Sequence, residues 1–280
     1  MRKTRLFAAA AAATALVLAG CSSSGGTDSE ATDGANTDAD GVITVTVGAS
    51  PSPHARMLRF IDEELAADAG IKLDIVEYTD YILPNEALKN GDLDANFYQT
   101  VPYLEGQEAE LGVDFTGGAP VHIEPLGVYS EKITDIADLP DGATIGIISD
   151  TQNQGRALQL LASGGLVKLP EGEDPTIFNV EKLGDFEFVE VEGAQLVRAL
   201  PDVDIAVING NYAQEGGLSV ADDALLVEEA EGNPAANILA WRAEDDANEG
   251  VQKLEELLHS PEVKQFIEET WTDGSVLPAF

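Results

Sequence analysis

Arg156 is the residue whose chemistry is clearest from its position in the sequence. It lies in the segment 149–156 (SDTQNQGR), which joins an expected strand to an expected helix. The first turn of a helix presents unpaired N–H groups and a partial positive charge, and a guanidinium adds two parallel donors that fit a carboxylate. The segment therefore predicts a carboxylate-binding site, and the structural alternative is a surface ion pair between Arg156 and a nearby acid.

Three further segments place polar or aromatic side chains beyond the ends of expected strands, where ligands bind in α/β sheets. They are 78–86 (YTDYILPNE), 96–103 (NFYQTVPY) and 209–212 (NGNY). Their rings suit a pocket, although core packing is the default role of any one aromatic side chain. Their asparagines suit ligand binding, with turn formation as the alternative. Together the segments predict a binding site.

Catalytic signals are scarce. His54, His122 and His259 are scattered and show no metal-ligand spacing, and the pattern His122-Ile123-Glu124 is too short to carry meaning, so we expect structural roles. The sequence contains no P-loop, dinucleotide fingerprint or nucleophile elbow. We therefore expect no catalytic residue, no metal and no cofactor, and an enzyme is the least favoured class.

Cys21, the only cysteine, follows a typical export signal. Three basic residues precede an apolar run over 6–19, which ends in small residues before the cysteine. Such a pattern defines a secretory signal peptide, expected here at 1–20. The position of Cys21 resembles the lipobox of bacterial lipoproteins, which implies acylation of the thiol and a lipid anchor. The alternative is an ordinary signal peptide with a chance cysteine.

Composition narrows the range of partners. The 280 residues include 15 Lys and Arg against 51 Asp and Glu, which gives a net charge of −36. This charge repels nucleic acid and anionic lipid head groups. Residues 22–41 are rich in Ser, Gly, Thr and Asp and cannot bury a core, so we expect 21–41 to be the lipidated cysteine and a disordered tether. The remaining length suffices for one large domain or two lobes.

Strands and helices alternate along the rest of the chain. Expected strands cover 43–47, 71–76, 143–148, 186–191 and 204–208, and expected helices cover 153–162, 194–200, 246–258 and 261–271. A further helix starts at Ser52-Pro53, with the Ser52 hydroxyl as its cap. This alternation predicts an α/β fold with parallel sheets and helical crossovers.

The run 80–88 (DYILPNEAL), followed by 91–96 (GDLDAN), resembles the methionine-binding lipoproteins of ABC importers, the NlpA lipoprotein family. The similarity extends over 42–280. It implies a two-lobed, periplasmic-binding-protein-like fold, with the ligand cleft between lobes joined by crossing strands. We expect lobe 1 at 42–129 plus 239–280 and lobe 2 at 130–238.

The resemblance also implies roles for individual residues. An arginine matching Arg156 meets the methionine carboxylate in this family. Asparagines matching three positions bind the head group, and aromatic residues matching three others line the side-chain pocket: Asn153, Asn209 and Asn237, and Tyr81, Tyr98 and Tyr103. The chain departs from the family pattern at Tyr98 (usually Phe), Thr100 (often His) and Ala236 (commonly aromatic). These changes alter pocket volume and polarity, so an amino-acid ligand is expected and methionine is the leading candidate.

We therefore interpret the chain as the lipid-anchored substrate-binding protein of an ABC importer, a monomer on the extracytoplasmic face of the cell membrane. It has no P-loop and no second apolar run of membrane-spanning length, so the permease and the ATPase must be separate partners. The alternative from another class is a surface lipoprotein for adhesion or signalling with a vestigial ligand site. Importer genes beside its own gene would favour transport.

Overall fold

The computed structural model describes residues 36–38 and 41–280. The expected signal peptide, Cys21 and most of the expected tether lie outside the described residues. Among the helices that are described, none is long and apolar enough to cross a membrane.

The end of the expected tether is ordered, contrary to prediction. Strand β1 (Asn36–Thr37) pairs antiparallel with the start of β2 (Ile43–Ala49). Gly41 adopts a positive φ of 83°, which suits a tight turn, and the Asp38 carboxylate accepts a hydrogen bond from the Val42 N–H at 3.1 Å. This turn chemistry favours the pairing although the composition alone indicates disorder.

The first of two large sheets has eight strands within the described part of the chain. Its order is β1-β2-β4-β14-β6-β15, with β3 beside β2 and β5 beside β14. Besides β1 and β2, its strands are β3 (Ile71–Glu77), β4 (Ala95–Thr100), β5 (Phe115–Gly117), β6 (His122–Ile123), β14 (Asn237–Arg242) and β15 (Leu277–Pro278). Strand β3 runs parallel to β2, as predicted. Strand β4, which was not predicted, is also parallel to β2, whereas β14 is antiparallel to β4.

Helices cover this sheet and complete its core. They are α1 (His54–Glu64), α2 (Ala66–Ala69), α3 (Leu83–Asn90), α4 (Val101–Leu111), α8 (Glu249–Leu258) and α9 (Pro261–Thr270), with a 3-10 turn η3 (Ala243–Asp245). Met57, Leu58 and Ile61 on one face of α1 are fully buried against β2 and the last two helices. Helix α1 has no side-chain cap, because Pro53 and not Ser52 occupies the cap position; the Ser52 hydroxyl donates to Gln214 Oε1 at 3.1 Å.

The second large sheet, in the described chain, has five strands in the order β11-β8-β12-β7-β13. They are β7 (Gly127–Tyr129), β8 (Ala143–Ile148), β11 (Phe186–Val191), β12 (Ile205–Ile208) and β13 (Leu226–Val227). Its helices are α5 (Thr151–Ser163), α6 (Leu196–Ala199) and α7 (Gly210–Glu215), with turns η1 (Ile136–Asp138) and η2 (Gly193–Gln195) and a hairpin of β9 (Val167–Lys168) and β10 (Glu181–Lys182). Leu158 and Leu161 of α5 pack in this core.

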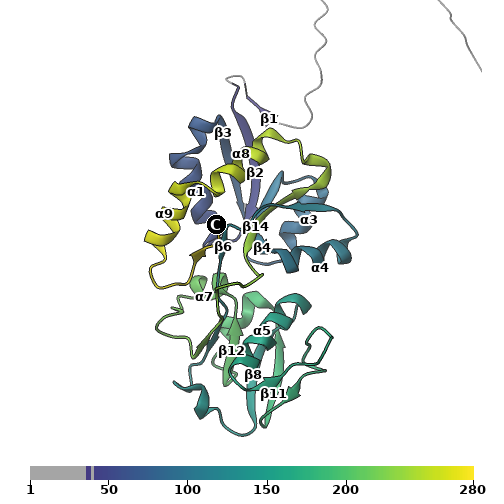
Figure 1. Cartoon of the computed structure of the whole chain (residues 1–280), viewed down its shortest axis with the longest axis vertical. Helices are drawn as coiled ribbons and strands as arrows, with labels where there is room; N and C mark the ends of the chain where they lie inside the picture. Colours follow the sequence, from purple (N-terminus) through teal and green to yellow (C-terminus); the bar gives the residue numbers. More distant parts are fainter. Residues whose placement is uncertain (1–35, 39–40) are drawn as a thin grey trace, which may run out of the picture. The chain divides into compact units, whose positions relative to one another are not determined.

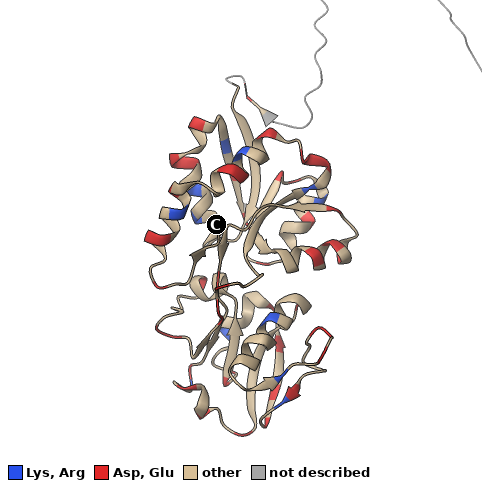
Figure 2. Ribbon diagram, viewed as in Figure 1, with Lys and Arg blue, Asp and Glu red and all other residues tan. Residues whose placement is uncertain are grey.

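The chain crosses between the sheets twice, after β6 and after β13. The two sheets with their helices form two lobes, the first above the second in Figure 1. Strand β7 belongs to the second sheet, whereas the expected boundary after 129 left its residues with lobe 1. Strand β14 begins at Asn237, so the expected boundary after 238 falls inside a strand. Asp and Glu residues are spread over both lobes (Figure 2).

Candidate functional site

A single cavity at the junction of the two sheets brings together all eight residues that the sequence suggested for ligand binding. It is lined by Tyr81, Tyr98, Thr100, Tyr103, Asn153, Arg156, Asn209 and Asn237, together with His54, Gln99, Glu124, Gly210 and Asn211. Its volume is small, about 30 Å³. Two wider grooves of about 450 and 830 Å³ share Tyr103 with it. The roles of these residues toward a ligand stay predictions.

Helix α5 positions the polar residues of the second lobe. The Asp150 carboxylate caps this helix by accepting from the Asn153 N–H at 2.9 Å and also accepts from the Asn153 amide at 3.1 Å. Asn153 Oδ1 in turn accepts from Asn209 Nδ2 at 3.0 Å. Two of the predicted head-group amides are therefore held in fixed orientations by their own hydrogen bonds.

Arg156 occupies the cavity wall and also forms an ion pair, so both interpretations of this residue describe part of its environment. Its Nε and Nη2 atoms donate to the two oxygens of Glu228 at 2.8 and 2.5 Å, and Nη2 donates to the Glu124 carbonyl at 2.8 Å. Burial acts to raise the pKa of Glu228, but the hydrogen bonds and charge of Arg156 outweigh it and the pKa lies below its ordinary value.

The aromatic residues form one connected group. The hydroxyls of Tyr98 and Tyr103 both donate to the Tyr81 carbonyl at 3.0 Å. The Tyr81 ring stacks on Tyr212 with ring centroids 4.8 Å apart, and its hydroxyl donates to Asn211 Oδ1. The Tyr98 hydroxyl, which was expected to change the polarity of the pocket, is therefore engaged in holding the segment that carries Tyr81.

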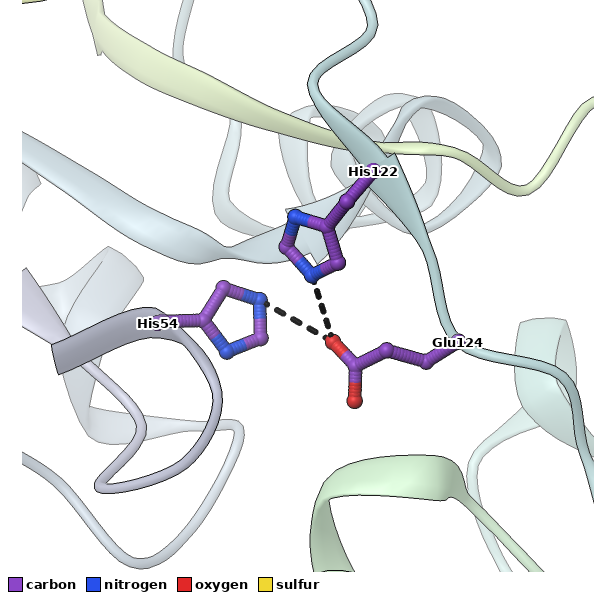
Figure 3. Close-up of side chains that lie close together, drawn as sticks. All are labelled: His54, His122 and Glu124. Atoms are coloured by element: carbon purple, nitrogen blue, oxygen red, sulfur yellow. Dashed lines mark hydrogen bonds and ion pairs between the residues drawn. The ribbon is translucent and has the colours of Figure 1, made fainter. Parts of the chain in front are cut away.

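Three residues that the sequence analysis set aside meet beside these rings. His122 Nε2 lies 2.8 Å and His54 Nε2 lies 3.3 Å from the same oxygen of Glu124, as Figure 3 shows. All three side chains are buried, and His54 Nε2 also lies 3.0 Å from Asn237 Oδ1. The expectation that the histidines are scattered is therefore wrong for His54 and His122, because the fold places the start of α1 next to β6.

Burial sets the protonation of this cluster. It lowers the pKa of His54 to about 4 and that of His122 to about 3, so both rings are neutral at physiological pH. It raises the pKa of Glu124 to about 7, even though the charge of Arg156 and a hydrogen bond from the Asn211 N–H act in the opposite direction. The cavity thus contains one carboxylate close to its titration point.

The cluster resembles a metal site in its side chains. One ligand atom from each of His54, His122 and Glu124 lies within 4.8 Å of the others, which is a donor set that zinc uses. A metal-bound imidazole, however, normally donates its second N–H to an acceptor. Both Nδ1 atoms are buried and have no hydrogen-bond partner in the described structure. The arrangement therefore fits a hydrogen-bonded cluster better than a metal centre.

Fold and site together define the class of two-lobed substrate-binding proteins. The model of the NlpA lipoprotein family matches residues 45–280, and the chain belongs to this family. A lipoprotein of Actinomyces odontolyticus is 62% identical, with a TM-score of 0.83 over 85% of this chain and 99% of that one. The methionine-binding lipoprotein MetQ of Bacillus subtilis is 36% identical over 94% of this chain and 93% of its own.

A related protein has been solved with a ligand. A nutrient-binding protein of Burkholderia cenocepacia bound to methionine is 36% identical, with a TM-score of 0.81 over 84% of this chain and 100% of that one. The similarity covers both lobes described above. The family membership expected from the run around Leu83-Pro84-Asn85-Glu86 is thus confirmed.

Proposed function

We propose that this protein is the substrate-binding component of an ABC importer and that it carries methionine or a closely related amino acid. The observation that supports this most directly is the composition of the cavity. An arginine, five amides and a buried carboxylate line it together with three tyrosine rings. An amino acid needs this combination, because its head group carries both charges and its side chain needs apolar contact.

The chemistry of the lining residues suggests how the ligand lies. The Arg156 guanidinium suits the α-carboxylate, and Asn153 and Asn209 add donors from the same lobe. Glu124 suits the α-ammonium group. The faces and edges of Tyr81 and Tyr103 suit a thioether, which makes favourable contacts with aromatic rings. Relatives named for methionine support this choice of ligand.

The transport role requires partners and an anchor. In this proposal acylated Cys21 ties the protein to the extracytoplasmic face of the membrane, where at least two acyl chains give stable anchoring. The monomer releases its ligand to a separate permease, which a separate ATPase drives. The protein itself binds and releases the ligand without changing it chemically.

Thermal melting with a panel of amino acids tests the proposal. Protein that mass spectrometry shows to be free of ligand is melted alone and with each of the twenty amino acids. A ligand at a hundredfold excess over its Kd stabilises by about 2.7 kcal/mol, which for a domain of this size raises the Tm by about 5–10 °C. We expect this response for methionine, and a flat response to all twenty would refute the transport function.

A further inference from the structure

We propose that His54 and His122 are positioning residues, whose neutral N–H groups both face Glu124 and hold it as an anionic receptor for the ligand's protonated amino group. The site would then require a free α-ammonium group and reject ligands that lack it. This inference rests on the proposed function, since it assigns one part of the same site. Neither histidine has to touch the ligand for the effect.

Geometry makes Glu124 the centre of the cluster. Both imidazole Nε2 atoms point at its Oε1, at 2.8 Å from His122 and 3.3 Å from His54. The carboxylate also accepts the backbone N–H of Asn211 at the start of α7. Gly210 allows this approach, because a Cβ atom there would lie 2.7 Å from that of Glu124. A carboxylate has about four lone-pair sites, so one remains for a ligand in the cavity that Glu124 lines.

The hydrogen-bond partners define which imidazole nitrogen carries the proton. His54 Nε2 faces two acceptors, Glu124 Oε1 and Asn237 Oδ1 at 3.0 Å, so it must be the donor. The Nδ1 atoms of both rings are buried without a partner in the described structure. A bare nitrogen there costs less than a buried N–H with no acceptor. Both rings therefore carry their proton on Nε2. His122 donates it to Glu124, and the N–H of His54, which is hydrogen bonded to Asn237, also faces the same Glu124 oxygen at 3.3 Å, so both favour the carboxylate form.

The charges around the cavity favour a cation beside Glu124. Arg156, on α5, is paired with Glu228, and these two charges offset each other. Burial, together with the charge of Glu124, raises the pKa of Glu215 on α7 to about 7. The titratable and charged groups that surround Glu124 are His54, His122, Arg156, Glu215 and Tyr81. Among these groups only Arg156 is cationic, and Glu228 already offsets its charge. The negative charge of Glu124 therefore has no cationic partner of its own, and the ligand's ammonium group supplies one.

The test compares L-methionine with 4-(methylthio)butanoate, which has the same side chain and carboxylate but no amine. Calorimetry between pH 5.5 and 8 gives both Kd values for the wild-type protein. Only ionised Glu124 binds the ammonium group. If the pKa of Glu124 is near 7 in the ligand-free protein, methionine affinity should rise roughly thirtyfold from pH 5.5 to pH 8. The analogue should bind at least tenfold more weakly at pH 8. Equal affinities at pH 8, or a flat pH profile for methionine, would overturn the inference.

Two substitutions separate a positioning role from a merely structural one. His122→Phe removes one donor to Glu124, so the midpoint of the methionine pH profile should move up by about one pH unit, which lowers the affinity at pH 7 about fivefold. His122→Gln keeps an N–H at similar reach and should restore the wild-type midpoint. If both variants keep the wild-type midpoint, His122 has no influence on Glu124 and the inference is wrong.

Two controls keep the outcomes distinct. Glu124→Gln should abolish both the pH dependence and the preference for the amine, and it provides the answer if His122→Phe does not fold. Zinc titrated into the wild-type protein should show no stoichiometric binding; tight binding that His122→Gln abolishes would make the cluster a metal site instead. If no amino acid binds at all, the proposed function fails. If methionine binds without these signatures, only the ammonium receptor fails.

Discussion

Replacing Arg156 with alanine tests whether this residue binds the ligand or only forms an ion pair. Its Nε and Nη2 atoms are engaged by Glu228 and by the Glu124 carbonyl, whereas Nη1 makes no hydrogen bond within the described residues. Nη1 is thus the group available to a ligand carboxylate. A charge-assisted hydrogen bond contributes about 1.5–3 kcal/mol, so Arg156→Ala should weaken methionine binding about 10- to 150-fold.

The same substitution should also destabilise the fold, because it leaves Glu228 without its partner. Breaking a buried ion pair costs about 3–5 kcal/mol. The side chains of Arg156 and Glu228 are each 13% exposed, so residual solvation favours the lower end, about 3 kcal/mol. Urea denaturation without ligand measures this cost separately from binding.

A matched variant distinguishes the two effects. Glu228→Gln keeps the size of the side chain but removes the charge that offsets Arg156. We expect it to lower stability while methionine affinity is kept or increased, because the guanidinium then has more positive charge to offer. Methioninamide, which has no carboxylate, serves as the ligand control and should bind Arg156→Ala and wild-type protein equally. The clamp is refuted if Arg156→Ala loses stability but binds methionine with wild-type affinity.

Cys21→Ala should release the protein from the membrane fraction without unfolding it, and a variant that still partitions into the detergent phase would contradict the lipid anchor. Tyr98→Phe removes one of two hydroxyl bonds to the Tyr81 carbonyl, so urea denaturation should show a loss of about 0.5–1.5 kcal/mol while calorimetry shows nearly unchanged methionine affinity. Thr100→His should alter the ratio of affinities for methionine and more polar analogues; an equal change for every ligand would place Thr100 outside the side-chain pocket.

The regular elements were predictable where an apolar run is bounded by turn residues. The expected strands at Ala143–Ile148 and Phe186–Val191 match β8 and β11 residue for residue. The antiparallel strands β7 and β14 were not predicted. Their pairing depends on segments far away in the sequence, such as Asn237 with Thr100. Local periodicity identifies a strand but carries no information about its neighbour.

At the N-terminal end of α1 a distant contact takes the place of an expected local one. Ser52 before Pro53 predicts a hydroxyl cap. In the structure Pro53 occupies the cap position, and the Ser52 hydroxyl donates to Gln214 Oε1, 162 residues away in the sequence, while Trp271 Nε1 donates to the same oxygen at 2.9 Å. A hydroxyl cap is worth about 1 kcal/mol, so a tertiary hydrogen bond of similar strength is enough to offset its absence.

The cavity residues were predictable because strand ends and helix starts collect at one edge of each sheet. The cluster of Glu124 with His54 and His122 was not predictable. His54 lies 68 or more residues before its two partners, and no sequence motif has such a spacing. One signal was present: the only charged residue in the run 121–128 (VHIEPLGV) is Glu124. A carboxylate in an otherwise apolar segment is rarely buried unless it is paired, which favours a functional site at that position.

The two segments that cross between the lobes carry the proposed ammonium receptor Glu124 and the acidic partner of Arg156, Glu228. Glu124 lies on the first and Glu228 on the second, and the two are tied together, since the Leu126 N–H donates to Glu228 Oε2 at 3.1 Å and the Glu228 N–H donates to the Leu126 carbonyl at 2.9 Å. Rotation of one lobe about these segments would carry Asn209 away from Asn237 while Glu124 stays near the axis. Contacts between the lobes that need no ligand are local, such as the hydrogen bond from the Tyr81 hydroxyl to Asn211 and the stacking of the Tyr81 ring on Tyr212. An amino acid that contacts both lobes therefore binds the closed form more tightly than the open form. This difference in affinity shifts the equilibrium between the two forms toward closure.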